Sequence, residues 1–145
     1  MSLYVLDTDH VTLFQRAHPV VVQRVAAVEP EALAVTVVTA EEQLRGWLKA
    51  IRRSTSGSKL VWAYAGLRAA LGYFNSVHLL DFDQVAYTRY EELRRQKIRI
   101  GTQDLRIAAI VLSVKGILVT RKRRDFKRVP GCTCTGRRCP ARWLL

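Results

Sequence analysis

Four short runs rich in apolar residues divide the chain, and stretches with helical patterns separate them. The runs lie at residues 3–6, 34–38, 77–80 and 117–120. Their length and continuity suit strands that are buried on both faces, which do not show the apolar–polar alternation of a half-exposed sheet. Strands that alternate with helices favour a parallel sheet covered by helices on both faces. We therefore expect an α/β fold.

Capping signals and apolar periodicity mark the helices between these runs. We expect helices at about 11–16, 19–28, 39–53, 59–74, 84–96 and 103–115. Thr8 or Asp9 would cap the first helix, and Thr102 would cap the last. Thr39 and Glu42 have the spacing of a capping box at the start of the third helix.

The charge of the chain is strongly basic and unevenly distributed. The sequence has 24 Lys and Arg residues against 12 Asp and Glu residues, and the basic excess lies after residue 44. Such an excess favours a nucleic-acid or other acidic partner, although a solvated basic face would have the same composition. No apolar run approaches the roughly 20 residues that span a bilayer. The N-terminus does not have the pattern of a secretory signal, so we expect a cytoplasmic protein.

The three cysteines, Cys132, Cys134 and Cys139, lie close together near the C-terminus. No fourth cysteine or nearby histidine completes a tetrahedral zinc set. A chain of 145 residues fits a single domain. We expect that domain to span residues 1–131, followed by a reduced Cys- and Arg-containing tail over 132–145.

Four acidic residues stand where expected strands end or helices begin: Asp7, Glu42, Asp104 and Asp125. In open α/β sheets, sites form beyond the carboxyl ends of the strands, so the fold could bring these acids together. Carboxylate oxygens are the ligands that Mg²⁺ prefers, and a bound metal ion activates water for attack on phosphorus. Grouped carboxylates repel one another without a cation. Together with the basic surface, this pattern indicates a metal-dependent nuclease.

Each acid also has a simpler interpretation. Asp7 could cap the first helix, and Glu42 could be the second half of a capping box. Asp104 could be a first-turn acid that the helix dipole favours. Asp125 could be a counter-ion among the bases around it.

Four segments resemble, in order, the motifs of PIN-domain ribonucleases, most nearly the VapC-like toxins of toxin–antitoxin systems. They are Leu6-Asp7-Thr8-Asp9, residues 37–46, residues 104–109 and residues 118–126. The resemblance implies a three-layer α/β/α fold around a five-stranded parallel sheet. It also implies Mg²⁺- or Mn²⁺-dependent cleavage of RNA by a homodimer that a cognate antitoxin blocks.

The resemblance also implies roles for individual residues. The acidic positions match Asp7, Glu42, Asp104 and Asp125, which would be both the metal ligands and the catalytic residues. Thr8 and Thr120 would support them. Lys122 stands where the family usually has Asn, and it cannot bind a metal ion while it is protonated. The basic residues nearest Asp125 would contact RNA phosphates: Arg121, Lys122, Arg123 and Arg124.

Two other functions remain open from the sequence. The segment 7–12 also fits the start of aspartyl-phosphate phosphatases, in which Asp7 would be the nucleophile and Asp9 a general acid. That family needs a late pair of acids, and this chain offers only Asp125. Lys122 instead suggests a decayed site in a basic module that binds RNA or an antitoxin.

Overall fold

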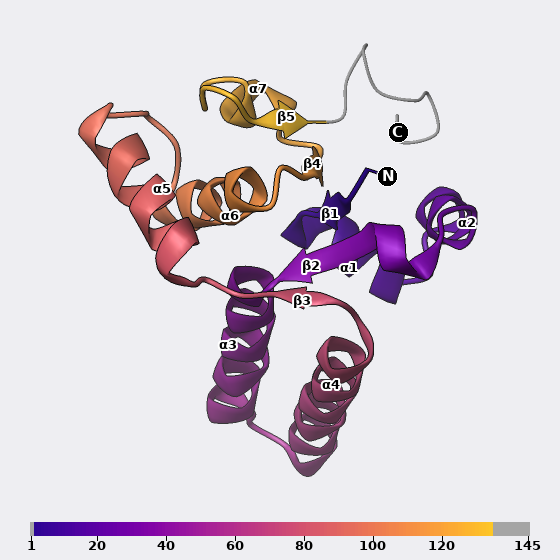
Figure 1. Ribbon diagram of the computed structural model, residues 1–145. Coiled ribbons are helices and arrows are strands. Elements are labelled where there is room, and N and C mark those ends of the chain that lie inside the picture. The colour runs from indigo at the N-terminus through magenta and orange to yellow at the C-terminus, as the bar shows by residue number, and fades with distance from the viewer. Residues whose placement is uncertain (1, 135–145) are drawn as a thin grey trace.

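The computed structural model describes residues 2–134 and shows a five-stranded parallel sheet in the order β3-β2-β1-β4-β5 (Figure 1). Each strand pairs with its neighbours in parallel. The strands are β1 (Tyr4–Leu6), β2 (Leu33–Thr36), β3 (Leu79–Leu80), β4 (Ile117–Val119) and β5 (Thr133–Cys134).

Helices cover both faces of this sheet. They are α1 (Thr8–Gln15), α2 (Pro19–Ala26), the short 3₁₀ helix η1 (Pro30–Ala32), α3 (Val37–Arg53), α4 (Gly57–Ser76), α5 (Gln84–Arg95), α6 (Thr102–Ser113) and α7 (Arg123–Phe126). Figure 1 shows α5 and α6 on one side and α1 and α2 on the other. The predicted three-layer α/β/α architecture is confirmed.

Successive residues of the central strand β1 face two separate cores. Val5 packs in one core, whose helical residues come mainly from α5 and α6. Tyr4 and Leu6 pack in the other, together with residues of α1, α3 and α4. Full burial of such side chains stabilises a fold by about 1.5–3 kcal/mol each. Both faces of β1 are buried, as its continuous apolar run predicted.

The fifth strand, which the resemblance implied and the apolar pattern did not mark, is Thr133–Cys134 paired with β4. It lies beyond residue 131, where we expected the domain to end, so the sheet itself includes residues 133 and 134. Cys132 and Cys134 are partly buried and pack against the core that contains the buried residues of α6. Burial raises the pKa of the Cys132 thiol to about 12, so it stays protonated. Cys139 and the rest of the expected tail lie outside the described residues.

The predicted caps Thr39 and Thr102 are wrong, whereas α1 is capped by Asp7, as one interpretation of that residue had it, and not by Thr8 or Asp9. Helix α3 begins at Val37, because Thr36 ends β2 and its Oγ1 accepts a hydrogen bond from the N–H of Thr39 at 3.2 Å. Helix α1 begins at Thr8 with Asp7 as its N-cap, and α6 begins at Thr102 after Gly101. The expected strand 34–38 included Val37 and Val38, which belong to α3. These two β-branched residues look like part of the strand because the first turn of α3 is buried like the strand before it.

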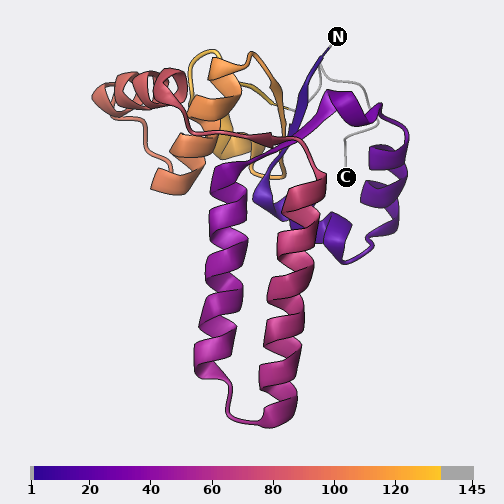
Figure 2. The ribbon, with the colours of Figure 1, turned by 60° about the horizontal axis from the view of Figure 1, so that its bottom comes forward.

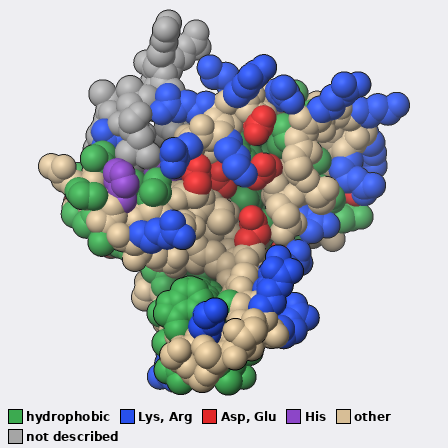
Figure 3. All heavy atoms as spheres, turned by 180° about the vertical axis from the view of Figure 1, so that it is seen from behind, with side chains coloured by type: hydrophobic (Ala, Val, Ile, Leu, Met, Phe, Trp, Pro, Cys, Tyr) green, Lys and Arg blue, Asp and Glu red, His purple; other side chains and the backbone are tan. Residues whose placement is uncertain are grey.

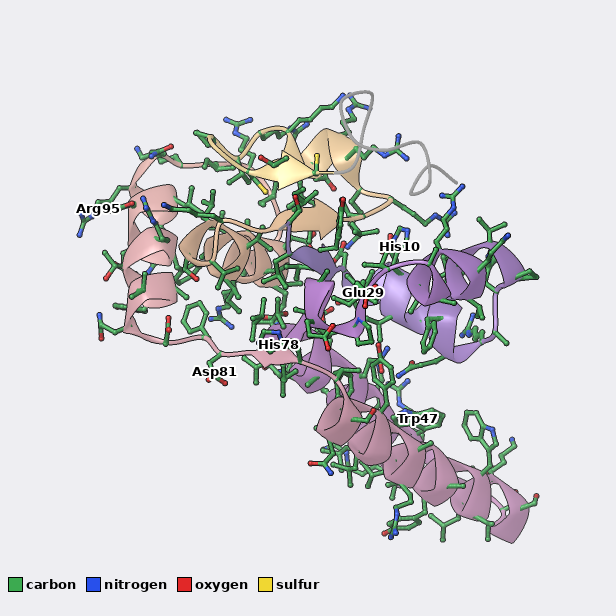
Figure 4. All side chains as sticks on the ribbon, turned by 45° about the vertical axis from the view of Figure 1, so that its right-hand side comes forward. His10, Glu29, Trp47, His78, Asp81 and Arg95 are labelled. Atoms are coloured by element: carbon green, nitrogen blue, oxygen red, sulfur yellow. The ribbon has the colours of Figure 1, made fainter. Side chains whose placement is uncertain are left out.

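Helices α3 and α4 form a long antiparallel hairpin that projects from the rest of the molecule (Figure 2). Trp47 lies on α3 (Figure 4). Its ring meets that of Trp62 on α4 edge to face, with ring centroids 5.0 Å apart. The Trp47 ring also lies directly over Gly66, where an added Cβ would overlap it. Gly66 therefore permits the close approach of the two helices.

We predict opposite effects of alanine at two glycines of α4. Gly66→Ala should lower the free energy of unfolding by about 1–3 kcal/mol, because the new methyl group would displace Trp47. Gly72→Ala should raise it by about 0.5–1 kcal/mol, because nothing lies near that position and alanine is the better helix former. Urea unfolding measures both. Equal shifts in the two variants would contradict the proposed packing.

Candidate acidic active site

Three of the four predicted acids, Asp7, Glu42 and Asp104, lie close together at the carboxyl edge of the sheet. Asp7 directly follows β1, and Thr120 directly follows β4. Helix α3 leaves β2 without a loop and carries Glu42 in its second turn, while Asp104 lies in the first turn of α6. Figure 3 shows acidic side chains gathered on this face, with Lys and Arg side chains around them.

Asp7 is the most buried acid of the group, with 1% of its surface exposed. Its Oδ1 accepts a hydrogen bond from the N–H of Thr8, and its Oδ2 accepts one from Thr120 Oγ1, both at 2.8 Å. Its own N–H donates to the Val119 carbonyl at 2.9 Å, which continues the sheet by one bond. Asp7 has no ion-pair partner among the described residues. Its carboxylate is thus held rigidly by neutral donors.

Burial raises the pKa of Asp7 to about 6, and the charges of Asp9 and Asp104 add to the effect, whereas the hydrogen bond from Thr120 opposes it. Burial also raises the pKa of Glu42, with a further contribution from the charge of Asp104. The acids are therefore close enough to repel one another. Such repulsion is expected where carboxylates gather to receive a cation.

Thr8 joins Asp7 to Glu42. Its N–H donates to Asp7, and its Oγ1 donates to Glu42 Oε1 at 3.2 Å and lies 3.0 Å from Thr39 Oγ1. Both threonines that we expected to support the acids thus contact one of them: Thr8 holds Glu42, and Thr120 holds Asp7.

The structure distinguishes Glu42 from its neighbour Glu41. Glu41 accepts hydrogen bonds from Gln103 at 2.9 Å and from Arg45 at 2.6 Å. The bond to Gln103 joins the start of α3 to the start of α6. Glu41 therefore holds two helices together, while Glu42 contacts Thr8 and feels the charge of Asp104.

Lys122 brings a positive charge into this group. Its Nζ lies 3.4 Å from one carboxylate oxygen of Asp104 and 3.5 Å from the other. Burial acts to lower the pKa of Lys122, but the charges of Asp104, Asp7 and Asp9 outweigh it and raise the pKa. Lys122 is therefore a stable cation at neutral pH.

Asp9 belongs to the same region, although the site prediction did not include it. Its Oδ1 accepts from the His10 N–H at 2.7 Å and lies 3.1 Å from His10 Nδ1, and its Oδ2 accepts from the Arg121 N–H at 3.2 Å. Burial acts to raise the pKa of Asp9, but the His10 and Arg121 interactions lower it overall. Its position two residues after Asp7 was the available sequence signal. Asp9 joins α1 to the segment after β4.

Asp125 stands apart in its interactions. It lies on α7 and is half-buried, and its carboxylate makes no hydrogen bond or ion pair with another residue of 2–134. The structure thus links Asp7, Glu42 and Asp104 through shared partners and mutual charge, and it shows no such link to Asp125.

The donor chemistry of the site fits a hard divalent cation. Asp7, Glu42 and Asp104 offer carboxylate oxygens, which Mg²⁺ and Mn²⁺ prefer, and the buried charge of Asp7 has no cationic partner of its own. Within residues 2–134, however, no three His, Cys, Asp or Glu side chains are arranged to hold a metal ion. These acids would have to move closer together to enclose one.

The comparisons with known proteins identify the fold. No protein-family model matches the chain, and no curated protein matches its sequence. Among solved structures, DNA-bound VapBC from Salmonella typhimurium has a chain with a TM-score of 0.76 and 21% identity, covering 93% of this chain and 98% of that one. FitAcB from Neisseria gonorrhoeae has a TM-score of 0.72 at 21% identity, with 99% and 100% covered. A chain of a toxin–antitoxin complex from Klebsiella pneumoniae has a TM-score of 0.68 and 20% identity, with 92% of this chain and 96% of that one covered.

These similarities confirm at the level of fold the resemblance that the sequence motifs indicated. The chain has a PIN-like α/β fold that matches VapC-type neighbours. Helices that combine the length and apolarity of a membrane span are absent from the part of the chain that the structure describes.

We predict that Asp7→Asn stabilises the metal-free protein in a pH-dependent manner. The pKa of Asp7 is about 6 in the folded protein and 3.8 ordinarily, so the folded state binds this proton more tightly. Ionisation of Asp7 therefore lowers the free energy of unfolding as the pH rises from about 4 to about 6. The variant should be more stable than the wild type by about 2–3 kcal/mol at pH 7, and this difference should vanish near pH 4.

Urea unfolding in chelator at pH 4, 5.5 and 7 measures this difference. Asp81→Asn changes an exposed acid in the loop after β3 and serves as the matched control (Figure 4). A stability gain from Asp7→Asn that stays constant across this range would contradict the role of the buried charge.

Proposed function

We propose that this chain, whose fold is that of VapBC-type proteins, is a metal-dependent endoribonuclease and the toxin of a toxin–antitoxin pair. The observation that carries the proposal is the buried carboxylate of Asp7, which two neutral donors hold beside Glu42 and Asp104. A carboxylate in this setting costs stability, and function is the physical reason to retain it.

In this proposal, Asp7, Glu42 and Asp104 hold Mg²⁺ or Mn²⁺, and Asp125 contributes as a fourth acid. The bound metal ion supplies an activated water and neutralises charge on the scissile phosphate. Thr120 and Thr8 fix the orientation of the Asp7 and Glu42 carboxylates by hydrogen bonds.

The bases of segment 121–124 bind the RNA backbone on either side of the cleaved bond. Arg121, Lys122 and Arg124 are exposed, and Arg123 is half-buried. The Arg121 N–H donates to Asp9, and the Lys122 ammonium pairs with Asp104. Because these contacts neutralise phosphates, binding of RNA should weaken as the salt concentration rises.

We further propose a cognate antitoxin as partner, a homodimer as the working unit and the cytoplasm as the location. The antitoxin is proposed because one structural neighbour with the same fold belongs to a toxin–antitoxin complex, and the match covers nearly all of both chains. The basic surface is complementary in charge to an acidic antitoxin segment as well as to RNA.

One observation favours the second candidate, a decayed module that binds RNA or an antitoxin without cleaving. Lys122 already pairs with Asp104, and no three acids within residues 2–134 are arranged around a metal ion. The experiment below separates the two functions, because a decayed module would bind RNA without cutting it.

We predict that Asp7→Asn and Asp104→Asn each reduce the rate of RNA cleavage by at least about a hundredfold. The purified variants should remain folded, since Asp7→Asn removes a destabilising charge. Gel analysis of RNA incubated with Mg²⁺ or Mn²⁺ measures the rate, and a chelator should stop cleavage by the wild type.

Asp81→Asn removes an exposed carboxylate that follows the edge strand β3, two strands from β1 and Asp7, and should cleave at the wild-type rate. The nuclease proposal fails if Asp7→Asn cleaves as fast as the wild type. It fails equally if the wild type binds RNA and leaves it intact with either metal ion.

A further inference from the structure

The backbone of Lys122 is hydrogen-bonded to the same threonine that holds Asp7. Its N–H donates to Thr120 Oγ1 at 2.9 Å, and the same hydroxyl donates to Asp7 Oδ2 at 2.8 Å. One threonine thus fixes both the most buried acid and the starting point of the lysine side chain. The place of Lys122 beside the acids is therefore built into the fold.

The ammonium of Lys122 lies almost equally far from the two oxygens of Asp104, at 3.4 and 3.5 Å. The charges of Asp7 and Asp9 also act on it, and its charge in turn acts on Glu42. Lys122 thus serves as counter-ion to the same carboxylates that would hold a metal ion. Its side chain is 50% exposed, so it can leave Asp104 for solvent without breaking the core.

Two cations cannot share these carboxylates at contact distance without strong repulsion. A protonated lysine has no lone pair and therefore cannot become a metal ligand itself. The acids are also not closed around a metal ion within residues 2–134. A divalent cation therefore cannot occupy the carboxylate of Asp104 while the Lys122 ammonium is paired with it.

We propose that the Lys122 ammonium and a divalent cation compete for Asp104, so that the metal ion must displace Lys122 before the acids can close around it. This inference rests on the proposed metal-dependent function. It assigns Lys122 a role that differs from phosphate binding, because it concerns the protein before any RNA is bound.

The test is Mn²⁺ binding to the full chain without RNA, measured by calorimetry at pH 7. Lys122→Met keeps most of the length of the side chain and removes its charge, and it should bind Mn²⁺ at least about tenfold more tightly than the wild type. Lys122→Arg restores a cation and should stay within about threefold of the wild type. Thermal melting confirms that each variant is folded.

Lys127→Met is the matched control, since it removes the same charge from the same basic segment. Lys127 is exposed and makes no ion pair with a described residue, so its replacement should change Mn²⁺ affinity by less than about twofold. Asp104→Asn should weaken Mn²⁺ binding, and in that background Lys122→Met should give a clearly smaller gain, because the carboxylate for which the two cations compete is gone.

The outcomes separate this inference from the proposed function. If the wild type binds Mn²⁺ and Lys122→Met binds it no more tightly, the competition is overturned and the metal site stands. An equal gain from Lys127→Met would also overturn the competition, since net charge alone would then explain it. If neither the wild type nor Lys122→Met binds Mn²⁺, the metal-dependent function fails and the inference fails with it.

Discussion

The hydrogen bond from Thr120 to Asp7 is the interaction on which the arrangement of the site depends. It joins residues 113 positions apart in the sequence, at the ends of the adjacent strands β1 and β4. The bond is possible because the two strands pair in parallel and end at the same edge of the sheet. The Thr120 hydroxyl also accepts the N–H of Lys122, so one side chain orients both an acid and a base.

Much of the fold could be predicted from the sequence, because its strands are buried on both faces and its helices have clear periodicity. The starts of α3 and α6 could not, since Thr36 and Gly101 cap these helices while Thr39 and Thr102 were equally good candidates from the local pattern. For α1 the pattern left Asp7, Thr8 and Asp9 open, and the structure selects Asp7. The strand Thr133–Cys134 escaped the pattern because two residues carry too little periodicity to recognise.

The site itself was predictable in part. Asp7, Glu42 and Asp104 could be placed together from their positions at strand ends and helix starts. The contacts of Asp9 with His10 and Arg121, and the absence of a described partner for Asp125, depend on side-chain directions that spacing does not give. The pairing of Lys122 with Asp104 likewise depends on a tertiary contact. Burial and mutual repulsion of the acids at this edge raise the pKa values of Asp7 and Glu42 and so lower the stability of the folded protein at neutral pH.

The direct passage from β2 into α3 determines where this fold can accept an insertion or a deletion. Thr36 is both the last residue of the strand and the cap of the helix, so no slack separates the sheet from Glu42. One residue inserted there would rotate Glu42 by about 100° around the helix axis, away from Thr8. The turn between α3 and α4 lies far from the acids, so a change of its length leaves them undisturbed. Insertions or deletions are therefore tolerated in the turn between α3 and α4, whereas at the junction of β2 and α3 they would separate Glu42 from the other acids.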